Sequence, residues 1–281
     1  MTAFVVFNPN SWGGRTGRDR RKIEGALEKV FPLMSFFVTT APAQAAHVVR
    51  EALRDGHLEI LAVGGDGTIN EALNGFFDRG APVSPDAVFS FVHSGHESRL
   101  CRRFGIPPGW LAGVAHLAKA KIHKQDVGRV ACLSQNGEPV TRFFLGESSF
   151  GLSAAAARAL GRDRLARLFG PGFASRLHRL SARLRWRETR VRLMTGSTDE
   201  IAGIASVSLN VGLPAASGLF DVSVLDGTNR AESARTLRSA RLTAAPTLDT
   251  KDLVDVETDG ESAGILPATF EIYPVAINLR V

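Results

Sequence analysis

Three glycines surround an aspartate in the segment Gly64-Gly65-Asp66-Gly67-Thr68, which could bind phosphate. The segment follows the apolar run 58–63 and precedes apolar residues at helical spacing, so we expect a turn between a strand and a helix. Backbone amides at such a turn bind phosphate well. The carboxylate of Asp66 would repel phosphate unless a divalent cation lies between them or the carboxylate accepts a proton during phosphoryl transfer. The pattern therefore favours kinase chemistry over a simple capped turn.

The start of the helix after this turn is predicted from its capping residues. Thr68 is a favoured N-cap residue, and Glu71 stands three positions later, which is the spacing of a capping box. Ile69, Leu73 and Phe76 then recur at helical spacing. We therefore expect the helix to begin at Thr68.

The first half of the chain alternates strand-like and helix-like segments. This alternation predicts an α/β domain with a parallel sheet, in which ligands bind at the carboxyl ends of the strands. Thr39 is expected at such an end. The loop 93–99 is expected at the same edge; its two histidines and one glutamate fit no zinc pattern, so we expect solvated side chains. The expected strands are 3–7, 35–39, 58–63 and 88–92, and the expected helices are 43–55, 99–104 and 110–119.

The second half of the chain is rich in β-type runs separated by turn residues, which predicts a mainly antiparallel second domain. We place the domains at 1–123 and 124–281. Asp259-Gly260 is a hairpin-turn signal, with the chain's last two strand-like runs beyond it. The β-type runs before it are 127–133, 141–145, 189–194, 204–210 and 220–225.

Composition limits the class of protein further. The net charge of +6 suits an anionic partner, and no nucleic-acid-binding motif accompanies it. No segment has the pattern of a signal peptide or of a membrane-spanning helix, so a cytoplasmic location is expected. The only two cysteines, Cys101 and Cys132, are expected to be small buried apolar residues. Composition gives no oligomeric state.

The arginine-rich segment 158–192 contains one amphipathic pattern. Phe173 and Leu177 begin an apolar helical face, beside which lies a basic face formed by Arg176, Arg179, Arg183 and Arg187. Peripheral docking on an anionic membrane and simple packing on the sheet are two interpretations of equal weight.

Several motifs in this order resemble the diacylglycerol kinase-like lipid kinases, which include bacterial lipid kinases, sphingosine kinases and ceramide kinases. The resemblance covers nearly the whole chain, and its central glycine-rich motif is shared with NAD kinases and phosphofructokinases. Asn-Glu-x-x-Asn-Gly after the glycine-rich turn and a late Asp-Gly-Glu favour the lipid branch. The motifs that carry the resemblance are Asn8-Pro9, Thr39, Gly64–Thr68, Asn70-Glu71, Asn74-Gly75, Gly105–Pro107, Asp126–Arg129, Gly218–Val222 and Asp259–Glu261.

The resemblance implies a nucleotide-binding α/β domain of the NAD kinase and diacylglycerol kinase type and a β-rich domain that binds lipid. The nucleotide cleft would lie between them, and the last strand would return to the first domain. It implies ATP and Mg²⁺ as cofactors and a membrane lipid as substrate. Glu261 would be the general base, and Asp66 would orient that site or hold Mg²⁺. The nucleotide-binding residues implied are Asn8, Thr39, Gly64, Gly65, Asp66, Gly67, Thr68, Ile69, Asn70 and Glu71.

Two departures from the family pattern are visible. The family's loop usually reads Pro-x-Gly-Thr-x-Asn-Asp, whereas His93–Arg99 lacks both the Thr and the Asn-Asp pair. Ser217 stands where the family has an aspartate that helps to hold a structural magnesium. The expected function is transfer of the ATP γ-phosphate to a hydroxyl of a diacylglycerol-like, sphingoid or ceramide-like lipid. The alternatives are a catalytically impaired lipid- or partner-binding protein and a kinase for a soluble substrate.

Overall fold

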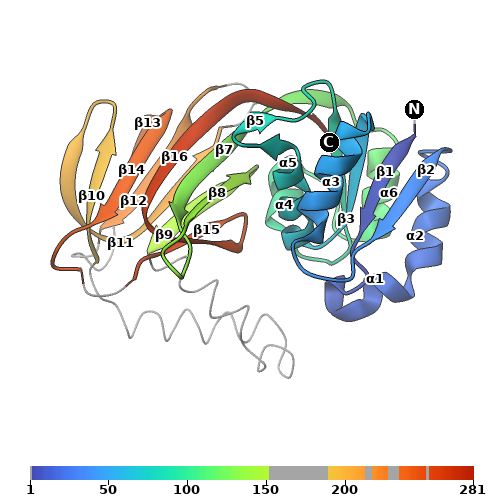
Figure 1. Cartoon of the computed structure of the whole chain (residues 1–281), viewed down its shortest axis with the longest axis horizontal. Coiled ribbons are helices and arrows are strands. Elements are labelled where there is room, and N and C mark those ends of the chain that lie inside the picture. Colours follow the sequence, from blue (N-terminus) through green and yellow to red (C-terminus); the bar gives the residue numbers. More distant parts are fainter. Residues whose placement is uncertain (1, 152–188, 213–216, 227–233, 251–252) are drawn as a thin grey trace.

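The computed structural model describes residues 2–151, 189–212, 217–226, 234–250 and 253–281. It has two lobes, an α/β lobe that contains the N-terminus and a β-rich lobe (Figure 1). The basic face predicted within 158–192 lies outside the described residues. Among the described residues, no helix combines the length and apolar character needed to cross a membrane.

The first lobe has a sheet in which β1, β3 and β6 are largely buried and the edge strand β2 is partly exposed. Its strands are adjacent in the order β2-β1-β3-β6 and every pair is parallel. The strands are β1 (Ala3–Phe7), β2 (Met34–Val38), β3 (Glu59–Gly64) and β6 (Val88–His93), and a small separate pair is formed by β4 (Phe77–Asp78) and β5 (Ala81–Pro82).

Helices cover both faces of this sheet because its side chains alternate along each strand. On β3, Ile60 and Ala62 pack with α3 and α4, whereas Leu61 and Val63 pack with α2 and α6. The near-continuous apolar sequence of β3 follows from this double coverage. The helical segments are η1 (Ser11–Gly14), α1 (Arg15–Arg18), α2 (Arg20–Leu27), α3 (Gln44–Arg54), α4 (Asp66–Gly75), α5 (Arg99–Phe104) and α6 (Trp110–Leu117).

The second lobe is built from antiparallel pairs, as the β-type runs predict. Its core contains one group of large buried side chains that includes Phe144, Phe150, Phe220 and Phe270. The strands are β7 (Ile122–Leu133), β8 (Pro139–Phe144), β9 (Glu147–Gly151), β10 (Thr189–Thr195), β11 (Asp199–Val211), β12 (Phe220–Asp226), β13 (Ala234–Ser239), β14 (Arg241–Pro246), β15 (Asp255–Thr258) and β16 (Glu261–Arg280).

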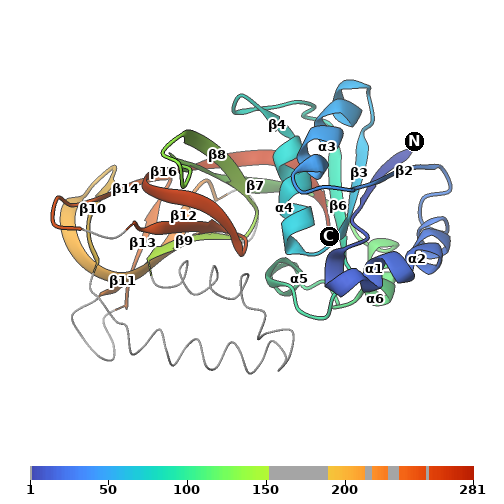
Figure 2. The same ribbon diagram turned by 60° about the horizontal axis from the view of Figure 1, so that its bottom comes forward.

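Strand β16 connects the lobes. Its first part pairs with β15 and β14, and its end, Asn278–Arg280, pairs in parallel with β6 of the first lobe. Arg280 then forms an ion pair of 2.6 Å with the buried Glu59 on β3. The pairing joins fourteen strands of the described chain into one sheet, along which β16 runs from one lobe to the other (Figure 2).

Side chains of α4 also hold the lobes together. Asn74 donates to the Phe143 carbonyl on β8 at 3.0 Å and accepts from the Phe143 amide at 2.9 Å. The rings of Phe77 and Phe143 stack at a centroid distance of 3.9 Å. These contacts place the C-terminal end of α4 and the adjoining β4 against the second lobe. The two cysteines are free and buried, as expected from the sequence.

Candidate active site

The predicted phosphate-binding turn lies at the carboxyl edge of the parallel sheet. Thr39 follows β2 and Asn8 follows β1, while Gly64 ends β3 opposite His93 at the end of β6. Because parallel strands end at one edge, four loops meet there. This is the position where open α/β sheets bind ligands.

The helix after the turn begins two residues earlier than predicted. Gly65 is the extended N-cap residue and α4 starts at Asp66, so the expectation of Thr68 as N-cap is wrong. Thr68 lies in the first turn, where its hydroxyl accepts a hydrogen bond from Asn8 at 2.8 Å. Glu71 accepts from the backbone amide of Ala43 at 3.2 Å instead of closing a capping box. Tertiary partners from two other loops therefore replace the local capping that the sequence suggests.

The loop after β1 packs on the turn and uses one of its amides. The Gly65 amide donates to the Ser11 hydroxyl at 3.1 Å. The amide of Ile69 is bonded to the Gly65 carbonyl at 3.1 Å as part of the helix. The remaining amides at the start of α4, those of residues 66–68, are the ones that a helix N-terminus offers to an anion.

The loop 93–99 holds the carboxylate of Asp66. The Ser98 hydroxyl donates to Asp66 Oδ1 at 2.5 Å, and the Arg99 amide donates to Oδ2 at 3.1 Å. His93 Nε2 lies 3.7 Å from Oδ1. His93 and Ser98 are buried, so the expectation that this loop is solvated is wrong for them, although His96 and Glu97 are exposed. The burial follows from their direct role in fixing Asp66.

Glu261 lies over the first turn of α4, beside Asp66. A methyl group added at Gly67 would come within 2.7 Å of Glu261 Oε1, so the carboxylate rests directly on this glycine. Burial of the carboxyl group raises the pKa of Glu261, and the charges of Asp66 and Glu71 raise it further. The two predicted catalytic acids therefore lie near each other at the start of α4, although they come from different lobes.

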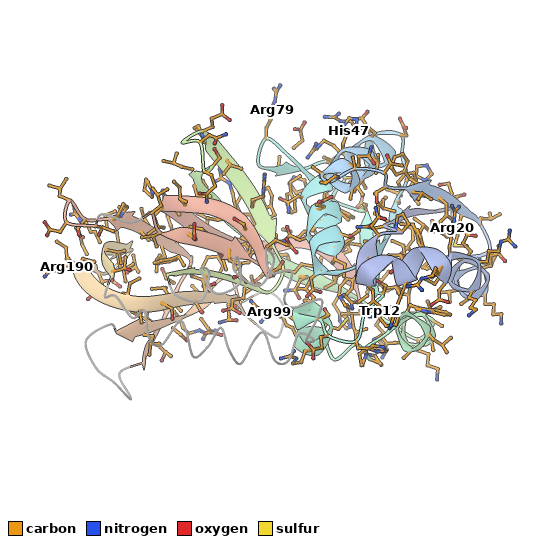
Figure 3. The ribbon with its side chains drawn as sticks, turned by 90° about the horizontal axis from the view of Figure 1, so that it is seen from below. Trp12, Arg20, His47, Arg79, Arg99 and Arg190 are labelled. Carbon is orange, nitrogen blue, oxygen red and sulfur yellow. The ribbon has the colours of Figure 1, made fainter. Side chains whose placement is uncertain are left out.

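A second, buried acid lies on the strand before Glu261. Glu257 is 3% exposed; its Oε1 accepts from the Arg99 guanidinium at 2.8 Å, while its Oε2 is buried and has no hydrogen-bond partner within the described parts of the chain. Burial raises the pKa of Glu257 to about 7, and Arg99 opposes the rise. Figure 3 shows Arg99 at the junction of the lobes, at the start of α5.

The turn that delivers Glu261 has the geometry that Asp259-Gly260 predicts. Both residues have positive φ, 49° and 94°, which a tight hairpin requires. The Asp259 carboxylate is buried and accepts from the amides of residues 145, 146 and 147 and from Asn70. Burial raises the pKa of Asp259, and these donors oppose the rise. Asp259 therefore fixes the turn that positions Glu261.

Some of the residues implied as nucleotide contacts serve other purposes. The Asn70 amide nitrogen donates to the Phe143 carbonyl and to Asp259, both at 3.1 Å. Ile69 is fully buried in the core, and the Thr39 hydroxyl donates to the Phe7 carbonyl at 3.4 Å. Asp66, Gly67 and Glu261 remain together at the start of α4, and Asn8 supports the turn through Thr68.

The resemblance implies two metal roles, Mg²⁺ held by Asp66 and a structural magnesium at the position of Ser217. The described residues fit the first of these roles. Asp66 offers carboxylate oxygens beside the amides of a helix start, which suits Mg²⁺ bound jointly with phosphates. At the position of the structural magnesium, the residues present do not fit a metal ion. The Ser217 hydroxyl is bonded to Leu219, and Asp126 accepts from the amides of Gly218 and Val275. No group of three or more metal-ligating side chains occurs in the described parts of the chain.

Sequence reasoning missed the residues that support the acids. Ser98 is the N-cap of α5 and accepts from the Cys101 amide at 2.9 Å, a role that a serine before a helix could have suggested. No such local signal marks Ser11, Arg99 or Glu257, because each bonds to a residue far away in the sequence. Ser11 is 54 residues from Gly65, and Arg99 is 33 residues from Asp66 and 158 from Glu257.

The fold of this chain is shared with solved structures of other proteins. The chain superposes on the crystal structure of a protein from Bacillus anthracis str. Sterne, provisionally named a diacylglycerol kinase, with a TM-score of 0.73 and 18% identity, covering 99% of this chain and 96% of the other. The chain also superposes on the structure of yeast NADH kinase complexed with NADH, with a TM-score of 0.52 and 10% identity. This superposition covers 100% of this chain and 82% of the other. At these identities the likeness concerns the fold.

Residues 2–130, slightly less than half of the chain, match the model of the diacylglycerol kinase catalytic domain. It is 32% identical over 106 residues to a diacylglycerol kinase of Bacillus subtilis strain 168, which is 37% of this chain and 33% of the relative. A relative from Streptococcus pneumoniae, provisionally named a lipid kinase, is 31% identical over 77 residues, 27% of this chain and 26% of its own length. The chain thus spans about a third or less of either relative.

Proposed function

We propose that this protein is an ATP- and Mg²⁺-dependent lipid kinase that phosphorylates a hydroxyl of a diacylglycerol-like, sphingoid or ceramide-like lipid. One observation carries the proposal: the Glu261 carboxylate rests on Gly67, beside Asp66, at the start of α4. This arrangement supplies a proton acceptor next to a phosphate-binding helix end. Phosphoryl transfer needs little more from a protein than such positioning and charge neutralisation.

Each acid has a distinct role in this proposal. Glu261 accepts the proton of the lipid hydroxyl as that oxygen attacks the γ-phosphate, and its raised pKa makes it a better base than an ordinary glutamate. Asp66 is fixed by Ser98 and by the Arg99 amide, and it would hold Mg²⁺. When bound, Mg²⁺ neutralises charge on the phosphate oxygens. The amides of residues 66–68 would bind the phosphates.

The location follows from the substrate. A kinase with a lipid acceptor works at a membrane surface, so we propose a cytoplasmic protein that attaches peripherally to a membrane. The arginines at 176, 179, 183 and 187 are the proposed contact with anionic lipid, and they lie outside the described residues. Its product would enter phospholipid synthesis or turnover.

The test is transfer of label from ATP to lipid in mixed micelles of diacylglycerol, sphingosine or ceramide. Asp66→Asn and Glu261→Gln should each lower the rate by about a hundredfold or more, which corresponds to about 2.7 kcal/mol of transition-state stabilisation. Glu51→Gln, an exposed acid on α3 paired with Arg54, is the matched control. Absence of any phospholipid product from the wild-type protein, or equal rates for wild type and Asp66→Asn, rejects the proposal.

A second candidate, an impaired kinase that binds lipid or a partner, is favoured by the loop 93–99. Arg99 stands where the family has an acid, and the Gly65 amide is already bonded to Ser11. Calorimetry with Mg²⁺-ATP separates the two candidates. Heat of binding that Asp66→Asn abolishes supports the kinase, whereas no heat from wild type supports the impaired protein.

A further inference from the structure

Arg99 links the two candidate acids through two different groups of one residue. Its backbone amide donates to Asp66 Oδ2 at 3.1 Å, and its guanidinium donates to Glu257 Oε1 at 2.8 Å. Arg99 is the first residue of α5 in the first lobe, whereas Glu257 lies on β15 in the second lobe, four residues before Glu261. Arg99 therefore contacts the first acid directly and also contacts the strand that leads to the second acid.

The strand that carries Glu257 is firmly tied to Glu261. In the hairpin of β15 and β16, Glu257 pairs with Ser262, the residue next to Glu261. The Ser148 hydroxyl donates to the Glu257 carbonyl at 2.7 Å and joins β15 to β9. A methyl group added at Gly260 would lie 3.9 Å from Glu257 Oε1, so the carboxylate lies beside the turn of the hairpin. A displacement of the Glu257 side chain would therefore be transmitted to Glu261.

The Glu257 carboxylate depends on Arg99 for its counter-charge. It is 3% exposed, and Arg99 is the cation paired with it within the described parts of the chain. Burial raises the pKa of Glu257, Arg99 opposes that rise, and the charges of Glu147 and Glu261 add to it. A buried carboxylate that loses its partner is costly, so Glu257 holds the guanidinium in place. The Arg99 side chain is 54% exposed, so it can be shortened without leaving a cavity in the core.

The pair of Arg99 and Glu257 is the hydrogen-bonded contact between α5 and the second lobe among the residues that the structure describes. The other interlobe hydrogen bonds come from Asn70 and Asn74 on α4 and from the pairing of β16 with β6. Those bonds fix α4 and the sheet. The Arg99 pair instead fixes the loop that holds the carboxylate of Asp66.

The pair is a feature of this chain and not of the motif that the chain resembles. The usual loop of the lipid kinases has an acid at the position of Arg99. In this structure an acid at that position would face Glu257, and the two like charges would repel each other. Arginine at residue 99 replaces this repulsion with an attraction across the junction of the lobes.

We propose that Arg99 is a positioning residue that aligns Asp66 with Glu261, its amide holding the first acid and its guanidinium holding the strand of the second. The inference rests on the proposed function and adds a residue to that site. Phosphoryl transfer depends steeply on the alignment of the groups that take part in it. Because Arg99 acts through the two acids, loss of its side chain should slow the chemical step more than it weakens substrate binding.

The kinetic test measures phosphorylation of lipid in mixed micelles at pH 8, above the Glu257 pKa of about 7, so that Glu257 is ionised. Arg99→Ala keeps the amide that binds Asp66 and removes only the guanidinium. Its kcat should fall about tenfold, while the KM values for Mg²⁺-ATP and lipid change less than about twofold. Arg99→Lys should recover part of the rate, because it keeps the charge.

The matched control is Arg192→Ala. Arg192 is 53% exposed and is paired with Asp199 inside the second lobe, so it resembles Arg99 in exposure and pairing but does not join the lobes. It should keep the kinetics of wild type. A raised KM at unchanged kcat in Arg99→Ala, or the same loss of kcat in Arg192→Ala, overturns the inference.

A double-mutant cycle tests whether Arg99 acts through Glu257. Glu257→Gln should lower kcat about threefold, because the remaining hydrogen bond to Arg99 is no longer charge-assisted. The double variant should be about as active as Arg99→Ala alone, since both substitutions break one interaction. Losses that multiply in the double variant, or full activity in Glu257→Gln, overturn the inference.

Hydrogen exchange separates this inference from the proposed function, because it needs no substrate. Arg99→Ala should speed amide exchange about tenfold in both 93–99 and 255–261, which belong to different lobes, and Arg192→Ala should change neither. If wild type phosphorylates no lipid, the proposed function fails, and the exchange rates still decide whether Arg99 links the lobes. Unchanged exchange in Arg99→Ala overturns the link, and faster exchange with the kcat of wild type overturns the positioning role.

Discussion

Asn70 on α4 and Asp259 in the hairpin before Glu261 lie 3.1 Å apart, joined by a buried hydrogen bond between the two lobes. The same carboxylate accepts three consecutive backbone amides of the second lobe. The position of Glu261 over α4 therefore depends on a polar contact that is itself inaccessible to solvent.

Asp259→Asn should destabilise the protein while preserving the turn, because asparagine also tolerates positive φ. The substitution removes a charged acceptor from up to four donors, which should cost about 2–4 kcal/mol of the free energy of unfolding. Chemical denaturation measures the loss. Asp249→Asn, a 79% exposed acid in a long 3.8 Å ion pair, is the control and should change the stability little. Similar stabilities for the two variants would contradict the assigned role.

Gly67→Ala should reduce activity without destabilising α4. The new methyl group would meet Glu261 Oε1 at 2.7 Å and displace the carboxylate, whereas alanine is otherwise favoured over glycine within a helix. Activity should fall at least tenfold while the melting temperature stays level or rises. Gly25→Ala in α2, where nothing lies within 4 Å of the added carbon, is the control for helix propensity alone. Full activity in Gly67→Ala would show that Glu261 need not rest on this turn.

Ser98→Ala should lower both activity and stability, since Ser98 caps α5 and donates to Asp66. Loss of the cap should cost about 1 kcal/mol. Ser98→Thr keeps both interactions and should restore activity. Ser98→Asp keeps the cap but cannot donate when ionised, so it should retain more stability than alanine and remain poorly active. An active Ser98→Asp would limit the role of Ser98 to capping.

The pH dependence of stability should carry a contribution from Glu257. Its pKa is about 7 in the folded protein against an ordinary value of 4.5, so the folded state binds the proton more tightly than the unfolded state. Proton binding at Glu257 therefore adds about 3 kcal/mol to the free energy of unfolding. This contribution is complete below pH 4.5 and is lost as the pH rises to about 7. Glu257→Gln should therefore lose less stability than wild type between pH 5 and pH 8 in denaturant titrations. Glu51→Gln should follow wild type, and identical curves for all three proteins would exclude a raised pKa.

The sequence predicted the parts of the fold that depend on local patterns. The strands around the glycine-rich turn and the helix at Arg99–Phe104 occur at the expected places, because apolar periodicity and a following glycine specify them locally. The Asp259-Gly260 turn was also predictable, because its conformation favours these two residue types. Strands β13, β14 and β15 were missed, since their short runs contain arginine, threonine and acids and are stabilised by their neighbours.

The sequence allowed the reacting acids of the candidate site to be predicted, but not the residues that hold those acids in place. Asp66 and Glu261 stand in recognisable motifs, and the structure brings them together at the start of α4. The capping role of Thr68 was predicted wrongly because Asn8, 60 residues away, binds its hydroxyl. Burial of His93 and Ser98 likewise depends on Asp66, so their local polar sequence indicated solvent exposure instead.

Strand β16 has a consequence for any attempt to divide the protein. A fragment that ends before β7 would lose the segment that covers β6, and it would leave Glu59 buried without its arginine. An uncovered apolar strand of this kind recruits other chains, so such a fragment is expected to aggregate. Between the parts of β16 in the two lobes, its register with β7 shifts between Tyr273 and Ile277, where Val275 has a φ of 49°. The C-terminal strand thus acts as a tether that limits how far the two halves can separate.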